Sequence, residues 1–174
     1  MGNTTSMNIR KPKILLVSSL FFILLLSLVV NAETILIIGD SHTEGAFGTE
    51  LERLLQGSGH TVIKEAVGGT NIYHWLVGEY ASHTFPNFQT LLETHDPDIS
   101  IIALGTNHLT QSSSTIRTRA STLVSFIPPT SKCIWIGPPQ VREDPPTVSS
   151  EDSSIIYTNQ HVDQVYAAIQ TGTS

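Results

Sequence analysis

The feature that most constrains the fold is an apolar run that ends abruptly in a short polar turn. The run covers residues 35–38, and Gly39, Asp40 and Ser41 follow it directly. Four consecutive apolar residues predict a strand buried on both faces, whereas glycine and aspartate favour a turn. The pattern therefore predicts a strand that brings Ser41 to the edge of a sheet, with Asp40 bracing the loop.

Short apolar runs alternate with longer amphipathic segments in the rest of the chain. The apolar runs predict strands at residues 34–38, 61–65, 99–104 and 133–136, and the amphipathic segments predict helices at residues 48–56, 72–77, 87–93, 115–126 and 155–168. This alternation is typical of a mostly parallel sheet with helices on both faces. Ligands bind such sheets at the carboxyl ends of the strands.

Polar, glycine-containing loops follow the first three predicted strands. The first contains Gly39-Asp40-Ser41, the second Val67-Gly68-Gly69-Thr70-Asn71, and the third Gly105-Thr106-Asn107-His108. Because the carboxyl ends of parallel strands meet at one edge of a sheet, we expect these three loops to lie close together.

The first thirty-two residues have the pattern of a signal peptide or an N-terminal membrane anchor. Arg10, Lys11 and Lys13 precede an uncharged stretch at residues 14–30, and small or branched residues lead up to a predicted cleavage site after Ala32. Either form would place the remaining domain outside the cytoplasm, as a secreted, periplasmic or membrane-anchored protein.

Residues 33–174 are predicted to form one acidic domain without a metal or cofactor. This part holds six basic and fifteen acidic residues, a formal charge of −9, which argues against binding to nucleic acid or anionic lipid. The histidines are scattered, without the spacing of metal ligands. The single cysteine, Cys133, lies in an apolar run and is predicted to be a buried, inert thiol.

The three loops resemble sequence blocks of the SGNH (GDSL-type) esterase family. The segments that carry the resemblance are GDSHTEGAFG, AVGGTN and GTNH. The resemblance implies a flavodoxin-like three-layer sandwich and a serine nucleophile at Ser41. It also implies an oxyanion hole formed by the N–H groups of Ser41 and Gly69 and the side-chain amide of Asn107. The implied activity is hydrolysis of acetyl or other short-chain esters of a carbohydrate or lipid by a secreted enzyme.

One block of this family has no counterpart in the chain. Members carry the aspartate and histidine of a catalytic triad in a C-terminal D-x-x-H block, whereas the last histidine here, His161, has Thr158 three residues before it. We therefore expect this block, with a last strand and helix, to lie beyond Ser174, and the 174-residue chain to be inactive by itself.

Other histidines and a tryptophan near the second and third loops are predicted to contact substrate. His74 and His108 are expected to line the mouth of the site rather than to replace the missing base. The sequence fits Trp75, Tyr73 and His74 equally well as a wall on which a sugar ring stacks and as core residues.

Two other functions stay open on the sequence. Without a base, the chain would be a non-catalytic carbohydrate-binding module or a defective fragment. The glycine-rich loops could also cradle a phosphate, but neither G-x-G-x-x-G nor the P-loop pattern occurs at a strand–helix junction.

Overall fold

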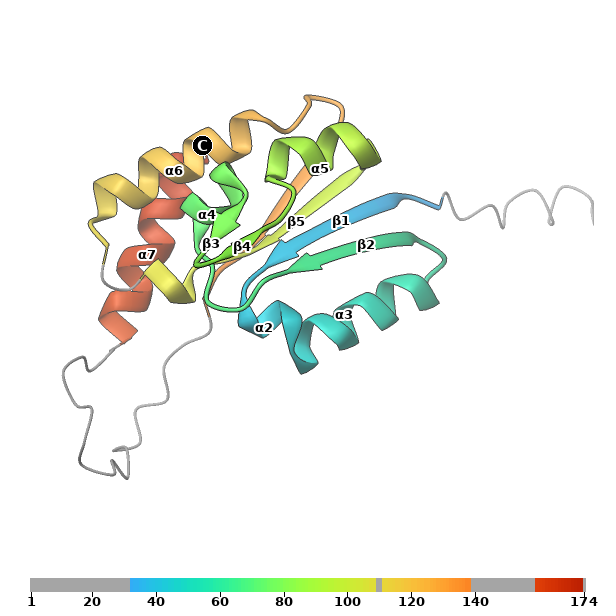
Figure 1. Ribbon diagram of the computed structural model, residues 1–174, viewed down its shortest axis with the longest axis horizontal. Helices are drawn as coiled ribbons and strands as arrows, with labels where there is room; N and C mark the ends of the chain where they lie inside the picture. The colour runs from blue at the N-terminus through green and yellow to red at the C-terminus, as the bar shows by residue number, and fades with distance from the viewer. Residues whose placement is uncertain (1–31, 109–110, 139–158, 174) are drawn as a thin grey trace, which may run out of the picture. The chain divides into compact units, whose positions relative to one another are not determined.

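A computed structural model of the chain describes residues 32–108, 111–138 and 159–173 (Figure 1). The chain divides into two units, residues 1–31 and residues 32–174, and the described residues all belong to the second. The predicted leader, apart from Ala32, therefore lies outside the described residues.

The main sheet has four parallel strands in the order β2-β1-β5-β6. Its strands are β1 (Thr34–Gly39), β2 (Thr61–Ala66), β5 (Ile99–Ala103) and β6 (Lys132–Ile136). All four predicted strands are confirmed, with ends that differ by no more than one residue. Because the pairing is parallel throughout, the loops after β1, β2 and β5 leave the sheet at the same edge.

The five predicted helices are present, α4 with the predicted ends and the other four with shifted ends. They are α3 (Ala46–Gly57), α4 (Ile72–Val77), α5 (Phe88–His95), α6 (Ser113–Ser125) and α7 (Asn159–Gly172). The sequence analysis missed three short elements: the helix α2 (Ser41–Glu44), the 3₁₀ helix η1 (Thr106–His108), and the hairpin of β3 (Glu79–Tyr80) and β4 (His83–Thr84).

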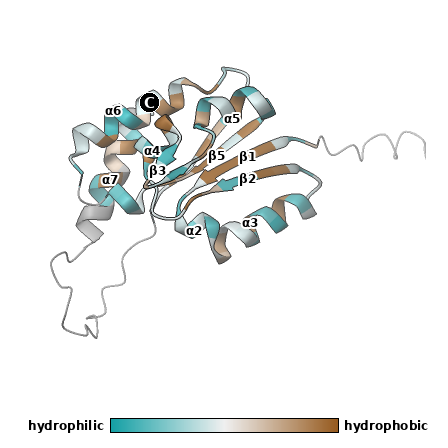
Figure 2. Ribbon diagram, in the orientation of Figure 1, coloured by the Kyte–Doolittle hydropathy of each residue, from teal (hydrophilic) through white to brown (hydrophobic). Residues whose placement is uncertain are grey.

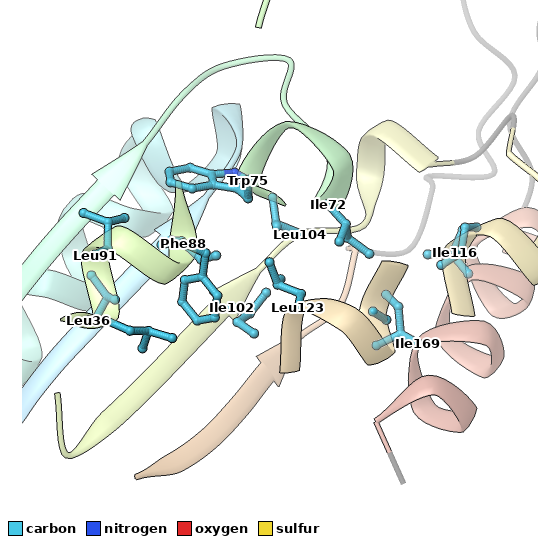
Figure 3. Close-up of a cluster of buried hydrophobic side chains, with 14 of the residues drawn as sticks. Leu36, Ile72, Trp75, Phe88, Leu91, Ile102, Leu104, Ile116, Leu123 and Ile169 are labelled. Atoms are coloured by element: carbon cyan, nitrogen blue, oxygen red, sulfur yellow. The ribbon is translucent and has the colours of Figure 1, made fainter. Parts of the chain in front are cut away.

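Alternate residues of the central strand pack into different layers. Leu36 and Ile38 face a large core that includes side chains of α4, α5, α6 and α7, and ten of its residues are labelled in Figure 3. Ile35 and Ile37 face a smaller core against α3. All four are at most 1% exposed. Helices thus cover both faces of the sheet (Figure 1), and brown apolar residues fill the central strands in Figure 2. The predicted three-layer α/β sandwich is confirmed.

The prediction that Cys133 is buried is wrong. Cys133 is exposed, as are its neighbours Lys132 and Ile134. The reason is that β6 pairs only with β5 and forms an edge of the described sheet. Partial burial still raises the pKa of the Cys133 thiol, which lowers the fraction of reactive thiolate.

Candidate active site

The turn after β1 packs tightly and presents Ser41 at its surface. Asp40 is 2% exposed, and its Oδ1 accepts a hydrogen bond from the N–H of His42 at 3.0 Å, which caps α2. A side chain at Gly39 would overlap the buried side chain of Thr43, so glycine lets the turn close onto the strand. Burial raises the pKa of the Asp40 carboxyl, and the His42 hydrogen bond offsets part of the rise. Asp40 therefore braces the loop, as predicted.

Ser41 itself is exposed and adjoins the second polar loop. Its hydroxyl has no hydrogen-bond partner among the described residues. A Cβ placed on Gly68 would lie 3.8 Å from the Cβ of Ser41, so the glycine loop borders the serine directly.

The second loop needs glycine at position 69. The φ angle of Gly69 is +79°, in the left-handed region that other residues rarely adopt. A Cβ at this position would also lie only 2.6 Å from the hydroxyl oxygen of Tyr80. The N–H of Gly69 donates to no group in the described part of the chain.

Thr70 ties all three polar loops together. It is completely buried, and its hydroxyl donates to the carbonyl of Val67 at 2.6 Å and accepts from the indole N–H of Trp75 at 3.1 Å. The N–H of Val67 in turn donates to the carbonyl of Gly39 at 3.1 Å. The carbonyl of Thr70 accepts from Nδ2 of Asn107 at 2.8 Å. The first, second and third loops are therefore connected by hydrogen bonds centred on one residue.

The amide of Asn107 retains unused donor capacity. Asn107 lies in η1, directly after β5, and is partly exposed. A carboxamide nitrogen carries two hydrogens. Nδ2 makes one hydrogen bond, to Thr70, and no second partner is present among the described residues. One hydrogen thus fixes the side chain, and the other is free to donate.

His108 makes a second connection between the second and third loops. Its Nε2 accepts from the N–H of Ile72, the first residue of α4, at 3.0 Å. The neutral ring must therefore carry its hydrogen on Nδ1, which lies 3.2 Å from Oε1 of Gln111. The same oxygen accepts from Nη1 of Arg119 at 2.8 Å. Burial lowers the pKa of His108 to about 4. We call the His108–Ile72 and Asn107–Thr70 hydrogen bonds the loop clamp.

The predicted substrate contact of His108 is wrong, and of the two interpretations of Trp75 the core residue is confirmed. Both side chains are at most 1% exposed. His108 is enclosed because it accepts a hydrogen bond from the start of α4, and Trp75 is a core residue (Figure 3) whose ring centroid lies 5.0 Å from that of Phe85. Neither can touch a ligand while the loops keep this arrangement.

His74 has a capping role, and its predicted contact with substrate stays a prediction. Its Nδ1 accepts from the N–H of Asn71 at 3.0 Å, which completes a capping box at the start of α4. Its ring lies 4.6 Å from that of Tyr80, centroid to centroid. Desolvation lowers the pKa of His74, and the positive charge of Arg119 adds to the effect.

A mostly apolar cavity of about 300 Å³ lies beside the serine turn. Asp40 and His42, which flank Ser41, line it together with Phe47, Leu104, Ile136 and Pro138. Pro138 is also where the described chain breaks off before residue 159.

The structure joins the loops of the three residues predicted to carry the chemistry. Ser41, Gly69 and Asn107 come from neighbouring strand ends, and the Thr70 hydrogen bonds and the close approach of Gly68 to Ser41 link their loops. Their individual roles stay predictions.

The described residues supply no base for Ser41. None of the histidine side chains that the structure describes is hydrogen-bonded to the serine hydroxyl. The side chain of His161, on α7, lies outside the described residues.

Thr70 and Tyr80 are site residues that the sequence analysis missed. Thr70 lies between Gly69 and Asn71 in the second loop, and only its burial reveals its role. Tyr80 lies on a hairpin of two-residue strands without the Asn-Gly or Asp-Gly turn that would have predicted it.

The described ranges contain neither a metal cluster nor a membrane-spanning helix. No group of histidine, cysteine and acidic side chains there could hold a metal ion. No helix in these ranges is both long enough and apolar enough to cross a bilayer.

The sequence matches no protein-family model and no curated protein. The fold, however, is similar to solved structures. A family 3 carbohydrate esterase from Clostridium thermocellum superposes with a TM-score of 0.55 and 20% identity, covering 82% of this chain and 71% of the other. The psychrotrophic esterase EstA from Pseudoalteromonas sp. superposes with a TM-score of 0.51 and 17% identity, covering 81% of this chain and 72% of the other. A candidate SGNH hydrolase from Slackia heliotrinireducens superposes with a TM-score of 0.59 and 15% identity, covering 82% of this chain and 74% of the other. The chain therefore has the fold of the SGNH hydrolases.

Proposed function

We propose that this chain carries the nucleophile and the oxyanion donors of a serine ester hydrolase. One observation carries the proposal: three hydrogen-bonded loops at one sheet edge hold three unused polar groups. These are the hydroxyl of Ser41, the N–H of Gly69 and the second amide hydrogen of Asn107, each without a partner among the described residues.

In the proposed reaction, the hydroxyl oxygen of Ser41 attacks the ester carbonyl carbon. Negative charge develops on the carbonyl oxygen, which accepts hydrogen bonds from the N–H groups of Ser41 and Gly69 and from Asn107. Collapse of the intermediate releases the alcohol, which takes the serine proton by way of a base, and leaves an acyl-serine that water then hydrolyses. The bond from Asn107 to Thr70 orients the amide in advance, so little reorganisation is needed during the reaction.

The general base is the part of this mechanism that the described residues do not supply. Since serine is a weak nucleophile at its ordinary pKa, hydrolysis requires a base within hydrogen-bond reach. We assign that role to a histidine outside the described residues. The family resemblance implies a D-x-x-H block for it.

We further propose a short-chain acyl ester of a carbohydrate or lipid as substrate, and an extracytoplasmic location. The similarity to a carbohydrate esterase fold supports the first part. The basic and apolar pattern before residue 33 supports the second. The strong negative charge of the domain fits a neutral substrate better than an anionic one.

Hydrolysis of p-nitrophenyl acetate by the full-length protein, base included, tests the proposal. Wild-type activity should be abolished in Ser41→Ala and kept in Ser121→Ala, which changes an exposed serine on α6. Asn107→Ala should lower kcat by about 10²- to 10³-fold, as the loss of an oxyanion donor does elsewhere. Asn87→Ala, which removes only the cap of α5, should leave kcat unchanged. Hydrolysis that is equal in wild type and Ser41→Ala would refute the mechanism.

A non-catalytic carbohydrate-binding module is the second candidate, favoured because no histidine among the described side chains is hydrogen-bonded to Ser41. Imidazole added as an external base separates the two. If the site lacks only its base, Ser41-dependent hydrolysis should rise with imidazole concentration, after subtraction of the rate with Ser41→Ala. Binding of an acetylated sugar without any Ser41-dependent hydrolysis, with or without imidazole, would establish the module instead.

A further inference from the structure

We infer that Tyr80 binds the substrate beside Gly69, through its phenol hydroxyl, and selects esters whose alcohol part carries further hydroxyl groups. The inference rests on the proposed function and extends it to the alcohol side of the substrate. It is carried by the position of the hydroxyl, by its lack of a partner among the described residues and by the way the ring is held.

The hydroxyl of Tyr80 occupies the space next to the predicted oxyanion donor. It lies 2.6 Å from the point that a Cβ at Gly69 would take, and ring atoms Cε1 and Cζ lie 3.0 Å from the same point. The phenol thus fills the place of the side chain that Gly69 lacks. The hydroxyl is therefore within reach of a molecule bound at the N–H of Gly69.

The hydroxyl is polar, and it makes no hydrogen bond within the described residues. Tyr80 itself is partly exposed. A phenol can both donate and accept a hydrogen bond. An oxygen atom of a bound molecule can therefore satisfy it without displacing any protein contact.

The ring is held in place before any ligand arrives. Tyr80 pairs with His83 across the β3–β4 hairpin, and the N–H of Phe85 donates to the carbonyl of Gly78 at 2.9 Å to close it. On its other side the ring packs against His74, with 4.6 Å between centroids and 51° between planes. His74 is itself fixed by the N–H of Asn71. A hydroxyl on so restrained a ring loses little freedom on binding.

The geometry assigns the alcohol part of the ester to Tyr80. The carbonyl oxygen already has three proposed donors, so the extra hydroxyl is free for a different oxygen. A simple alkyl ester offers only its ether oxygen, whereas a sugar ester carries hydroxyls next to the acylated position. The apolar ring face with a polar tip also matches the mixed surface of a sugar.

Binding measured in a Ser41→Ala background tests this assignment without depending on turnover. The probes are 6-O-acetyl-D-glucose and hexyl acetate, followed by the NMR shifts of the Gly69 and Asn107 amides. Tyr80→Phe keeps the ring and removes only the hydroxyl. We expect the Kd for the sugar ester to rise about 3- to 10-fold, the effect of one neutral hydrogen bond, and the Kd for hexyl acetate to stay unchanged.

The matched control is Tyr73→Phe, because Tyr73 is an exposed tyrosine on α4. Its ring centroid lies 4.8 Å from Cζ of Arg119. It should leave both affinities unchanged, and the melting temperature of Tyr80→Phe should equal that of the background. Equal Kd values before and after Tyr80→Phe, or equal losses for both probes, would overturn the inference alone. If neither ester shifts the two amides in the background protein, the proposed function fails first.

Discussion

Replacing His108 with glutamine tests the loop clamp quantitatively. Burial lowers the pKa of His108 from 6.5 to about 4 in the folded protein, because it disfavours the charged ring. Only the neutral ring can accept the Ile72 hydrogen bond. In the unfolded chain the ring takes up a proton below pH 6.5, whereas the folded chain resists protonation down to about pH 4. The free energy of unfolding must therefore fall as the pH is lowered through this window.

The magnitude follows from the two pKa values. Proton linkage predicts a loss of about 2 kcal/mol between pH 7 and pH 5, rising to about 3 kcal/mol at pH 4. This is a large part of the stability of an ordinary domain. In His108→Gln the amide oxygen can still accept from the N–H of Ile72 but cannot titrate, so this part of the pH dependence should disappear.

Urea unfolding at pH 7 and pH 5, followed by circular dichroism, measures the effect. His74, with a lowered pKa, and Asp40, with a raised one, act in both proteins, so the difference between wild type and His108→Gln isolates His108. His83→Gln, an exposed histidine on β4, is the control and should behave like wild type. The reasoning is refuted if wild type and His108→Gln lose the same free energy between the two pH values.

Two further predictions concern Thr70 and Cys133. Thr70→Val should lower the free energy of unfolding by about 1–3 kcal/mol, because the buried indole N–H of Trp75 loses its acceptor. The exposed control Thr122→Val should lower it much less in the same urea titrations. Equal losses would argue against the role of Thr70 in connecting the loops. Cys133 should react with Ellman's reagent in the native protein because it is exposed. The reaction should be slower than that of free cysteine at the same pH, because the pKa of the Cys133 thiol is raised. A thiol that reacts only after unfolding would show that the edge of β6 is covered.

The strands and the three loops could be predicted because their signals are local. Residues 35–38 leave no solvent-facing position, and the polar turn that follows fixes where β1 must end. The order of such strands then brings Ser41, Gly69 and Asn107 to one edge without knowledge of any contact.

Burial of individual polar and aromatic side chains could not be predicted in the same way. His108 ends the third loop and is expected at the mouth of the site, and the sequence cannot distinguish a sugar-stacking role for Trp75 from a core role; tertiary packing turns both side chains inward. The exposure of Cys133 depends on which strand forms the edge of the sheet, and its apolar neighbours give no information about that order. The Tyr80 hairpin has strands of two residues, too short for an alternating pattern to show.

The β3–β4 hairpin forms a sheet separate from the parallel one. It adjoins the site through packing of the Tyr80 side chain on His74 and Gly69 rather than through the hydrogen bonds that converge on Thr70. Its sequence can therefore diverge, or be exchanged by a protein engineer, while the nucleophile and its donors keep their positions. Selectivity and reactivity would then evolve on separate pieces of the same chain, with residues 79–84 as the natural segment to randomise in a search for new substrates.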